Sequence, residues 1–264
     1  MSRLIASTAI QLQRNLLHRE FWLQLIVGRI LPIAVPLLAW RALFDYTGAA
    51  ELQGWDKHEM STYYIIVFFI SLFASIDFNY EMSSMVHKGT LSQWLLRPLS
   101  FFETAASHIL ARILMLLIPG LLIILIGVLM IPDFPSRSPE LSLMSAFAVL
   151  PFSIIMFGIL SAAVGLISFW TMHTESVFAL ILLILEFFGG RLLPLELLPA
   201  WLRPLSDFLP LRYAISLPAE AILNPGQYSI LLIFGGQIFW CLALLLAAMF
   251  LWRIGLKRYD AVGG

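Results

Sequence analysis

The chain has 264 residues, of which 60% are hydrophobic and 12% charged, and its formal net charge is +0. A soluble domain carries about 25% charged residues, so the composition excludes an ordinary water-soluble protein. The absence of net positive charge argues against a nucleic-acid partner. Cys241, the only cysteine, lies in an apolar run and is expected to be a small buried hydrophobic residue. These numbers predict a membrane protein.

The first segment, residues 1–20, has no continuous apolar run of the kind found in a cleavable signal peptide. Its polar residues repeat at three- and four-residue steps: Arg3, Ser7, Gln11, Arg14 and His18. Ile5, Leu12 and Leu16 fall on another face of the same helix. This amphipathic pattern predicts a helix lying in the membrane interface. The alternative is a cytosolic extension of the first membrane span.

Apolar runs then follow one another along the chain, and about 20 apolar residues suffice to cross a bilayer. Six membrane spans are expected, at residues 21–44, 60–78, 108–131, 141–170, 176–188 and 228–252. The fifth is short for a full crossing unless its neighbours extend it. The expected fold is therefore an all-α membrane protein, with residues 1–264 forming a single transmembrane domain.

The distribution of charged residues predicts on which side of the membrane the two termini lie. Nine Lys and Arg residues fall in the segments assigned to the inside and six in those assigned to the outside. The loop after the first span carries Asp45, Glu51, Asp56 and Glu59 against Lys57 alone. Because basic residues concentrate in cytoplasmic loops, both termini are expected in the cytoplasm.

Two charges lie within apolar runs, Arg29 in the first span and Glu186 in the fifth. A charge at the bilayer centre costs at least about 2.5–3.5 kcal/mol and usually faces protein or water. We expect Arg29 to reach toward the cytoplasmic headgroups. Glu186 is expected to pair with Arg191, or with Arg29 if their depths match, and a role in substrate contact or gating is a hypothesis. The histidines show no metal-ligand spacing, so no metal site is expected.

The segment 189–227 is apolar but repeatedly interrupted by proline, at Pro194, Pro199, Pro204, Pro210, Pro218 and Pro225. Proline removes a helix hydrogen bond and clashes with the preceding turn, which predicts short helices joined at prolines. At membrane depth such a backbone is tolerated only where protein or a water-filled cavity surrounds it.

Two stretches resemble the permease subunits of ABC-2 type transporters, which are mostly bacterial exporters. The first is GTLSQWLLRPL at 89–99, and the second is FFGGRLLPLELLPAWLRPL at 187–205, continuing through FLPLR at 208–212 to Pro218. The whole layout is similar too: an N-terminal interfacial helix, six spans, a cytoplasmic loop after span 2 and a re-entrant helical hairpin between spans 5 and 6.

The resemblance implies an exporter that works as a dimer of permeases, identical or related, in the bacterial cytoplasmic (inner) membrane. Each permease would dock on a separate ABC ATPase subunit, and ATP and Mg²⁺ would bind in that partner. The chain itself contains no G-x-x-x-x-G-K-[ST] motif, so it is not expected to be an enzyme. Membrane lipids are the other expected contact.

The resemblance also implies a coupling helix at about 84–98, ended by Pro98. Leu91, Trp94 and Leu95 share one helical face and would form an apolar anchor for the ATPase. The surrounding docking contacts would come from His87, Lys88, Gly89 and Arg97. The alternative is an amphipathic helix on lipid headgroups, with Trp94 as an interfacial anchor.

In the same reading the proline-rich segment is the outer gate, and its candidate residues are Arg191, Pro194, Glu196, Pro199, Trp201 and Arg203. A passive lid over the span ends is the alternative, with Trp201 as an interface anchor. For the whole protein, the main alternative is a secondary transporter driven by an ion gradient, which would favour internal repeats. An intramembrane enzyme and a membrane anchor that merely recruits the ATPase are further alternatives.

Overall fold

A computed structural model of the chain describes residues 2–17, 23, 31–52, 54–73, 78–96, 100–131, 134–135 and 138–259. These residues are helical apart from one small hairpin and the connecting turns. The elements are α1 (Ser2–Leu17), α3 (Leu31–Thr47), β1 (Glu51–Leu52), β2 (Trp55–Asp56), α4 (Lys57–Phe73), α5 (Phe78–His87), α6 (Leu91–Leu95), α7 (Phe101–Met130), α8 (Pro139–Leu166), η2 (Ile167–Phe169), α9 (Thr174–Phe188), η3 (Leu195–Leu197), α10 (Arg203–Phe208), α11 (Pro210–Ala214), α12 (Ser216–Leu223) and α13 (Ile230–Arg258).

Among the described residues, four segments are long and apolar enough to cross a membrane: Lys57–His87, Phe101–Met130, Glu140–Phe169 and Leu231–Arg258. They correspond to the second, third, fourth and sixth expected spans. The second half of the expected first span, from Leu31, forms part of α3, and residues 21–22 and 24–30 of that span lie outside the described residues. α9 has 15 residues, which is short of the roughly 20 that a crossing needs. The count of six spans therefore stays a prediction.

Several spans have bounds that differ from those expected, most clearly α7 and α13. α7 begins at Phe101 rather than near position 108, because Ser100 and Glu103 form a capping box. The Ser100 hydroxyl accepts from the Glu103 amide at 3.2 Å, and the Glu103 carboxylate accepts from the Ser100 amide at 2.8 Å. At the other end of the chain, α13 continues to Arg258 rather than ending near position 252.

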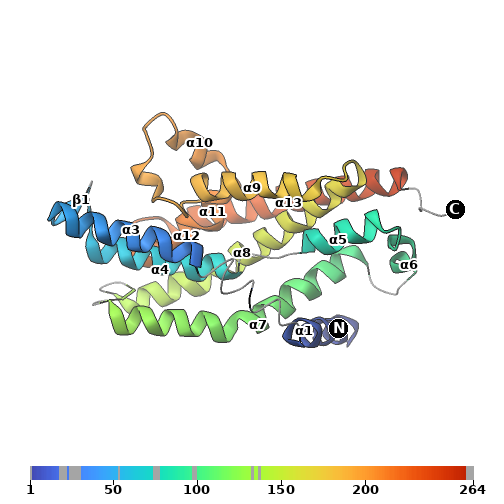
Figure 1. Cartoon of the computed structure of the whole chain (residues 1–264), viewed down its shortest axis with the longest axis horizontal. Coiled ribbons are helices and arrows are strands. Elements are labelled where there is room, and N and C mark those ends of the chain that lie inside the picture. Colours follow the sequence, from blue (N-terminus) through green and yellow to red (C-terminus); the bar gives the residue numbers. More distant parts are fainter. Residues whose placement is uncertain are drawn as a thin grey trace.

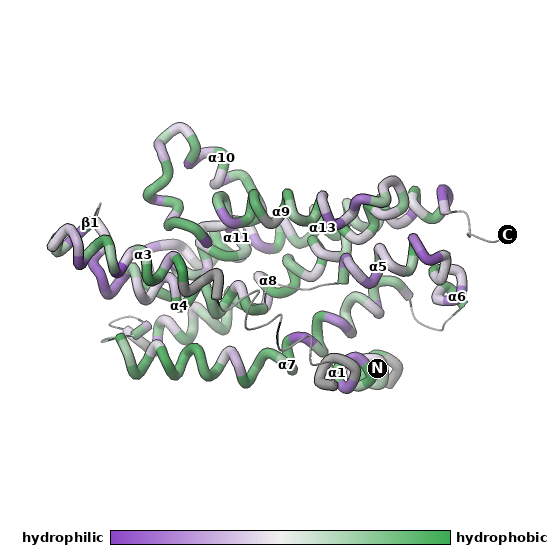
Figure 2. Tube along the Cα trace, viewed as in Figure 1, coloured by the Kyte–Doolittle hydropathy of each residue, from purple (hydrophilic) through white to green (hydrophobic). Residues whose placement is uncertain are grey.

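The long helices α7, α8 and α13 run along the longest dimension of the molecule (Figure 1). α3, α4 and the hairpin gather at one end, while α5, α6 and the C-terminal end of α13 gather at the other. Figure 2 shows that hydrophobic residues dominate α7, whereas hydrophilic positions appear where α5 meets α6. The two ends of the molecule thus carry different parts of the sequence, the loop between α3 and α4 at one and the expected coupling region at the other.

α1 lies across the long helices and packs against α7 (Figure 1). Its Ser7 hydroxyl donates to the Ser107 hydroxyl at 2.9 Å, and Thr8 is buried beside it. Ile5 and Ile10 are 58% and 65% exposed. Ser7, in the polar stripe of this helix, therefore faces α7, and the exposed face is apolar apart from Gln13, as suits a helix that touches lipid.

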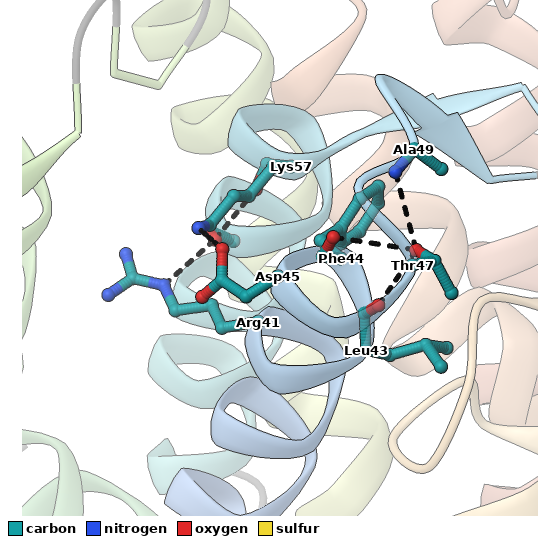
Figure 3. Close-up of polar contacts among 8 residues, drawn as sticks. Arg41, Leu43, Phe44, Asp45, Thr47, Ala49 and Lys57 are labelled. Atoms are coloured by element: carbon teal, nitrogen blue, oxygen red, sulfur yellow. Dashed lines mark hydrogen bonds and ion pairs between the residues drawn. The ribbon is translucent and has the colours of Figure 1, made fainter.

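α3 and α4 form an antiparallel pair joined by the hairpin, and polar contacts close the pair near that end (Figure 3). The Lys57 ammonium pairs with the Asp45 carboxylate, and the Arg41 Nε donates to the Ser61 hydroxyl at 3.2 Å. The Thr47 hydroxyl donates to the Leu43 carbonyl at 2.8 Å at the end of α3. Because Lys57 and Asp45 are well exposed, their pair contributes little stability, and apolar packing holds these helices.

The core lies where α4, α8 and α12 meet. Every residue of α12 is buried, so this short helix has no face toward the surroundings. Small residues allow the spans to approach one another. A Cβ at Gly165 would lie 2.9 Å from the Cα of Asn79, so α8 and α5 are in backbone contact there. Such close approach is how helices associate in membranes, where burial of apolar surface gives little driving force.

Candidate functional site

The segment expected to form one coupling helix, which we call the docking segment, is two helices in its described residues, 84–96. α5 ends at His87, a turn spans residues 88–90, and α6 covers Leu91–Leu95. Gly89 has a φ of +70°, a left-handed conformation that ends helices and favours glycine. The expectation of a single helix over 84–98 was therefore wrong. Arg97 lies outside the described residues.

The expected apolar anchor faces the chain's own core. Leu91 is fully buried and Trp94 is 5% exposed. The Trp94 ring lies 6.4 Å from that of Phe101, on α7, and 6.2 Å from that of Trp252, on α13. Leu91 and Trp94 are therefore buried within the chain, where Trp94 attaches α6 to two spans, and their direct contact with a partner stays a prediction. Leu95, at 44%, is the exposed member of the predicted trio.

What remains exposed on this segment is a small surface of mixed chemistry, which we call the docking surface. It consists of Lys88, Thr90, Gln93, Leu95 and Leu96. Leu96 is 87% exposed. Two adjacent exposed leucines on a segment that also exposes a lysine suit an apolar contact with a polar margin.

His87 connects the docking segment to the chain rather than to the surroundings. Its Nε2 lies 3.1 Å from the Thr171 carbonyl oxygen, in the link before α9, and Nε2 must donate because a carbonyl only accepts. Its Nδ1 lies 3.4 Å from the Ser83 hydroxyl, which donates to the Thr174 hydroxyl at 3.2 Å. His87 thus fastens the end of α5 to the start of α9.

α5 is held by polar contacts to two further helices. Glu81 pairs with His108 of α7, and the Ser161 hydroxyl of α8 donates to the Asn79 side-chain oxygen at 3.2 Å. Asn79 and Ser161 are both buried, so this bond is protected from water. A displacement of α5 must therefore move or break contacts with α7, α8 and α9.

The proline-rich segment consists of short helices, η3, α10, α11 and α12, with proline at their starts or between them. Pro194 is buried, whereas Glu196, Pro199 and Trp201 are exposed. Arg203 holds the loop together, because its Nε donates to the Leu198 carbonyl at 2.9 Å and its Nη2 to the Glu196 carbonyl.

The charge expected in the fifth span has a local partner. The Glu186 carboxylate accepts from Arg191 Nη1 at 2.8 Å, which is one of the two pairings considered from the sequence. Arg29, the other candidate partner, lies outside the described residues. The pair sits where α9 passes into the proline-rich segment.

A buried carboxylate on α12, that of Glu220, was not among the functional residues predicted from the sequence. Glu220 is 3% exposed, its Oε2 lies 3.9 Å from Arg212 Nη2, and Tyr228 hydrogen-bonds to its side chain. Arg212 also pairs with Asp207. Burial raises the pKa of Glu220 to about 7, against the lowering effect of Arg212. Its signal in the sequence was a lone charge between apolar residues.

A buried amide also joins three elements. The side-chain Nε2 of Gln237, on α13, lies 3.1 Å from the Val149 carbonyl oxygen, 3.2 Å from the Ser153 hydroxyl and 3.1 Å from the Tyr213 carbonyl oxygen. The neighbouring Gly236 lets the Tyr213 ring approach, since a Cβ there would lie 2.0 Å from it. Gln237 therefore fixes α11 against α8 and α13.

Comparison with known proteins agrees with this architecture. Residues 30–263 match a family described as ABC-2 family transporter protein. No curated protein matches the chain. The matched range contains every element from α3 to α13, including both the docking segment and the proline-rich segment. The chain therefore belongs to the ABC-2 family of transporters, as a multi-pass membrane permease.

Proposed function

We propose that this permease is the membrane subunit of an ATP-binding cassette exporter and that a separate ATPase subunit drives it. The family match supports a transport subunit. The 264 residues contain no P-loop motif for ATP, so ATP and Mg²⁺ bind in the partner. Two permeases, identical or related, form the pathway as a dimer with a pair of ATPase subunits.

The docking surface carries this proposal. Leu95 and Leu96 are exposed on the same short segment as Lys88 and Gln93, while Leu91 and Trp94 of α6 are buried. A contact at this surface would act on a rigidly attached element, because Trp94 and His87 anchor both sides of the turn. His87, Gly89, Leu91 and Trp94 are positioning residues, and Arg97 remains a predicted direct contact.

The proline-rich segment is proposed as the outer gate. Arg203 fixes its loop, Glu186 and Arg191 pair at its start, and Trp201 is 78% exposed at its edge. Pro194 and Pro199 break the backbone into short pieces that are able to move without unwinding a span. An exposed aromatic at this place is available to the second permease or to lipid.

The orientation is proposed from charge and architecture together. α5, α6 and the end of α13 share one end of the molecule (Figure 1), and α13 ends with Arg253, Lys257 and Arg258. Basic residues favour the cytoplasmic side. Both termini are then cytoplasmic in a bacterial inner membrane, with the α3–α4 hairpin outside.

The test is recovery of an ATPase subunit when the chain is purified from its own membrane in mild detergent. The variant L95A/L96A is expected to weaken ATPase binding by about tenfold or more. The matched control is L231A, because Leu231 is 83% exposed at the opposite end of α13. ATPase recovery is expected to be normal for L231A. Wild-type recovery by L95A/L96A would remove the docking assignment.

A further inference from the structure

Two adjacent tyrosines of α4 hold the start of the proline-rich segment. The Tyr63 hydroxyl donates to the Gly190 carbonyl at 2.8 Å, and the Tyr64 hydroxyl donates to the Leu192 carbonyl at 2.6 Å. Both side chains are buried, at 0% and 1% exposure. The two bonds therefore fix alternate residues of one turn from the same helix.

The tyrosines are themselves held in place. The Trp40 indole, on α3, donates to the Tyr64 hydroxyl at 2.8 Å. The Trp55 ring, on β2, meets the Tyr63 ring edge-on with centroids 5.4 Å apart. The Tyr64 hydroxyl thus accepts one bond and donates another, which fully orients it. Trp40 and Trp55, from two elements at the same end of the molecule, thus hold the two tyrosines of α4.

The turn is shaped to receive them. Gly190 has a φ of +78°, which favours glycine. A Cβ at this position would also lie 2.5 Å from the Tyr63 hydroxyl and 2.7 Å from the Ser216 Cβ. Glycine is therefore required at position 190 for two reasons, the backbone conformation and the close approach of Tyr63. Arg191, between the two accepting residues, directs its charge to Glu186.

Apolar packing alone would not explain two hydroxyls aimed at main-chain carbonyls. A phenylalanine at either position would fill nearly the same space. The hydroxyls are therefore needed to hold the turn in position and not to fill the core. The turn they hold joins α9 to the proline-rich segment, and α4 belongs to the segment Lys57–His87, whose other end is the docking segment.

We propose that Tyr63 and Tyr64 form a latch that sets the resting position of the outer gate relative to the span leading to the docking surface. This rests on the proposed function of residues 191–203 as a gate. The latch fixes the gate through the backbone at Gly190 and Leu192, so its action depends on the two hydroxyls and on the absence of a side chain at 190.

The experiment measures gate position in the full chain with its ATPase partner. In a C241S background, which removes the only cysteine, spin labels are placed at A50C and A200C. Both alanines are exposed, one in the loop before β1 and one in the proline-rich segment. The distance distribution is recorded without nucleotide and with ATP bound, for the wild type, Y63F/Y64F and the control Y46F. Tyr46 is 90% exposed at the end of α3.

Loss of both hydroxyls is expected to raise the population of displaced gate conformations by about thirtyfold. The nucleotide-free distribution should broaden in Y63F/Y64F and not in Y46F, with ATPase recovery unchanged in both. G190A, which disturbs the latch from the opposite side, should displace the gate likewise, and it decides the question if Y63F/Y64F does not fold.

Distributions like the wild type in Y63F/Y64F overturn the latch, even if transport is lost, because the hydroxyls then act elsewhere. In that case the proposal of an outer gate is kept if ATP changes the distance between the two labels in the protein with Tyr63 and Tyr64 intact. If the distance between the two labels in that protein is the same with and without ATP, both the outer gate and the latch are overturned. The failure of the latch and the failure of the proposed function are thus separate results.

Discussion

Replacing Trp94 tests whether α6 is part of the core or a free docking helix. The Trp94 side chain is 5% exposed and meets two aromatic rings, those of Phe101 and Trp252. Those two rings stack on each other with centroids 4.5 Å apart. Trp94→Ala therefore opens a cavity beside a stacked pair that belongs to two spans.

The cost follows from burial. Truncation of a buried tryptophan to alanine costs about 3–5 kcal/mol, and edge-to-face aromatic pairs account for about 0.5–1.5 kcal/mol each within that total. Trp94→Phe keeps a ring in the same place and is expected to cost about 1–2 kcal/mol. Leu96→Ala, at an 87% exposed position, is expected to leave stability within about 0.5 kcal/mol.

The assay is the apparent unfolding temperature in detergent at a fixed scan rate, measured beside ATPase recovery. Trp94→Ala should lower both the temperature and the recovery, because it loosens the element that presents the docking surface. Leu96→Ala should lower recovery alone. A wild-type unfolding temperature in Trp94→Ala would refute the burial argument and return Trp94 to the partner interface. Combining Trp94→Ala with Leu95→Ala would mix the two effects.

Two further substitutions test the buried contacts of the proline-rich segment. Gly236→Ala places a Cβ 2.0 Å from the Tyr213 ring and is expected to destabilise by at least about 1–3 kcal/mol; Gly235→Ala, with nothing within 4 Å, is the control and should be neutral or slightly stabilising. Equal unfolding temperatures for the two would contradict the contact. Glu220→Gln tests a titration. The folded pKa of Glu220, about 7, lies above its ordinary 4.5, so its contribution to stability is full below about pH 4.5 and is lost as pH rises through about 7. The variant should therefore flatten the fall in unfolding temperature between pH 5 and about pH 8, and an unchanged pH profile would show that Glu220 does not titrate there.

Local signals predicted much of the architecture. The apolar runs predicted the helices that became α4, α7, α8 and α13, because hydropathy and length are properties of each segment alone. The prolines of 189–227 predicted short helices for a similarly local reason. Family membership also followed from short stretches of sequence.

The sequence could not predict which side chains meet. Trp94 looked like a free anchor because Trp252, its partner on α13, is far away in the chain. The end of α5 at Gly89 also changed which residues of the segment face outward.

The sequence by itself determined that this is a helical membrane permease, because composition, helix length and proline position act within each segment. Only the tertiary structure decided which face of α6 is exposed and how Glu220 is enclosed. It also decided that Tyr63 and Tyr64 reach the turn at Gly190 and Leu192. Each of these depends on contacts between segments that meet only when the helices pack, and such contacts leave no periodic signal in the chain.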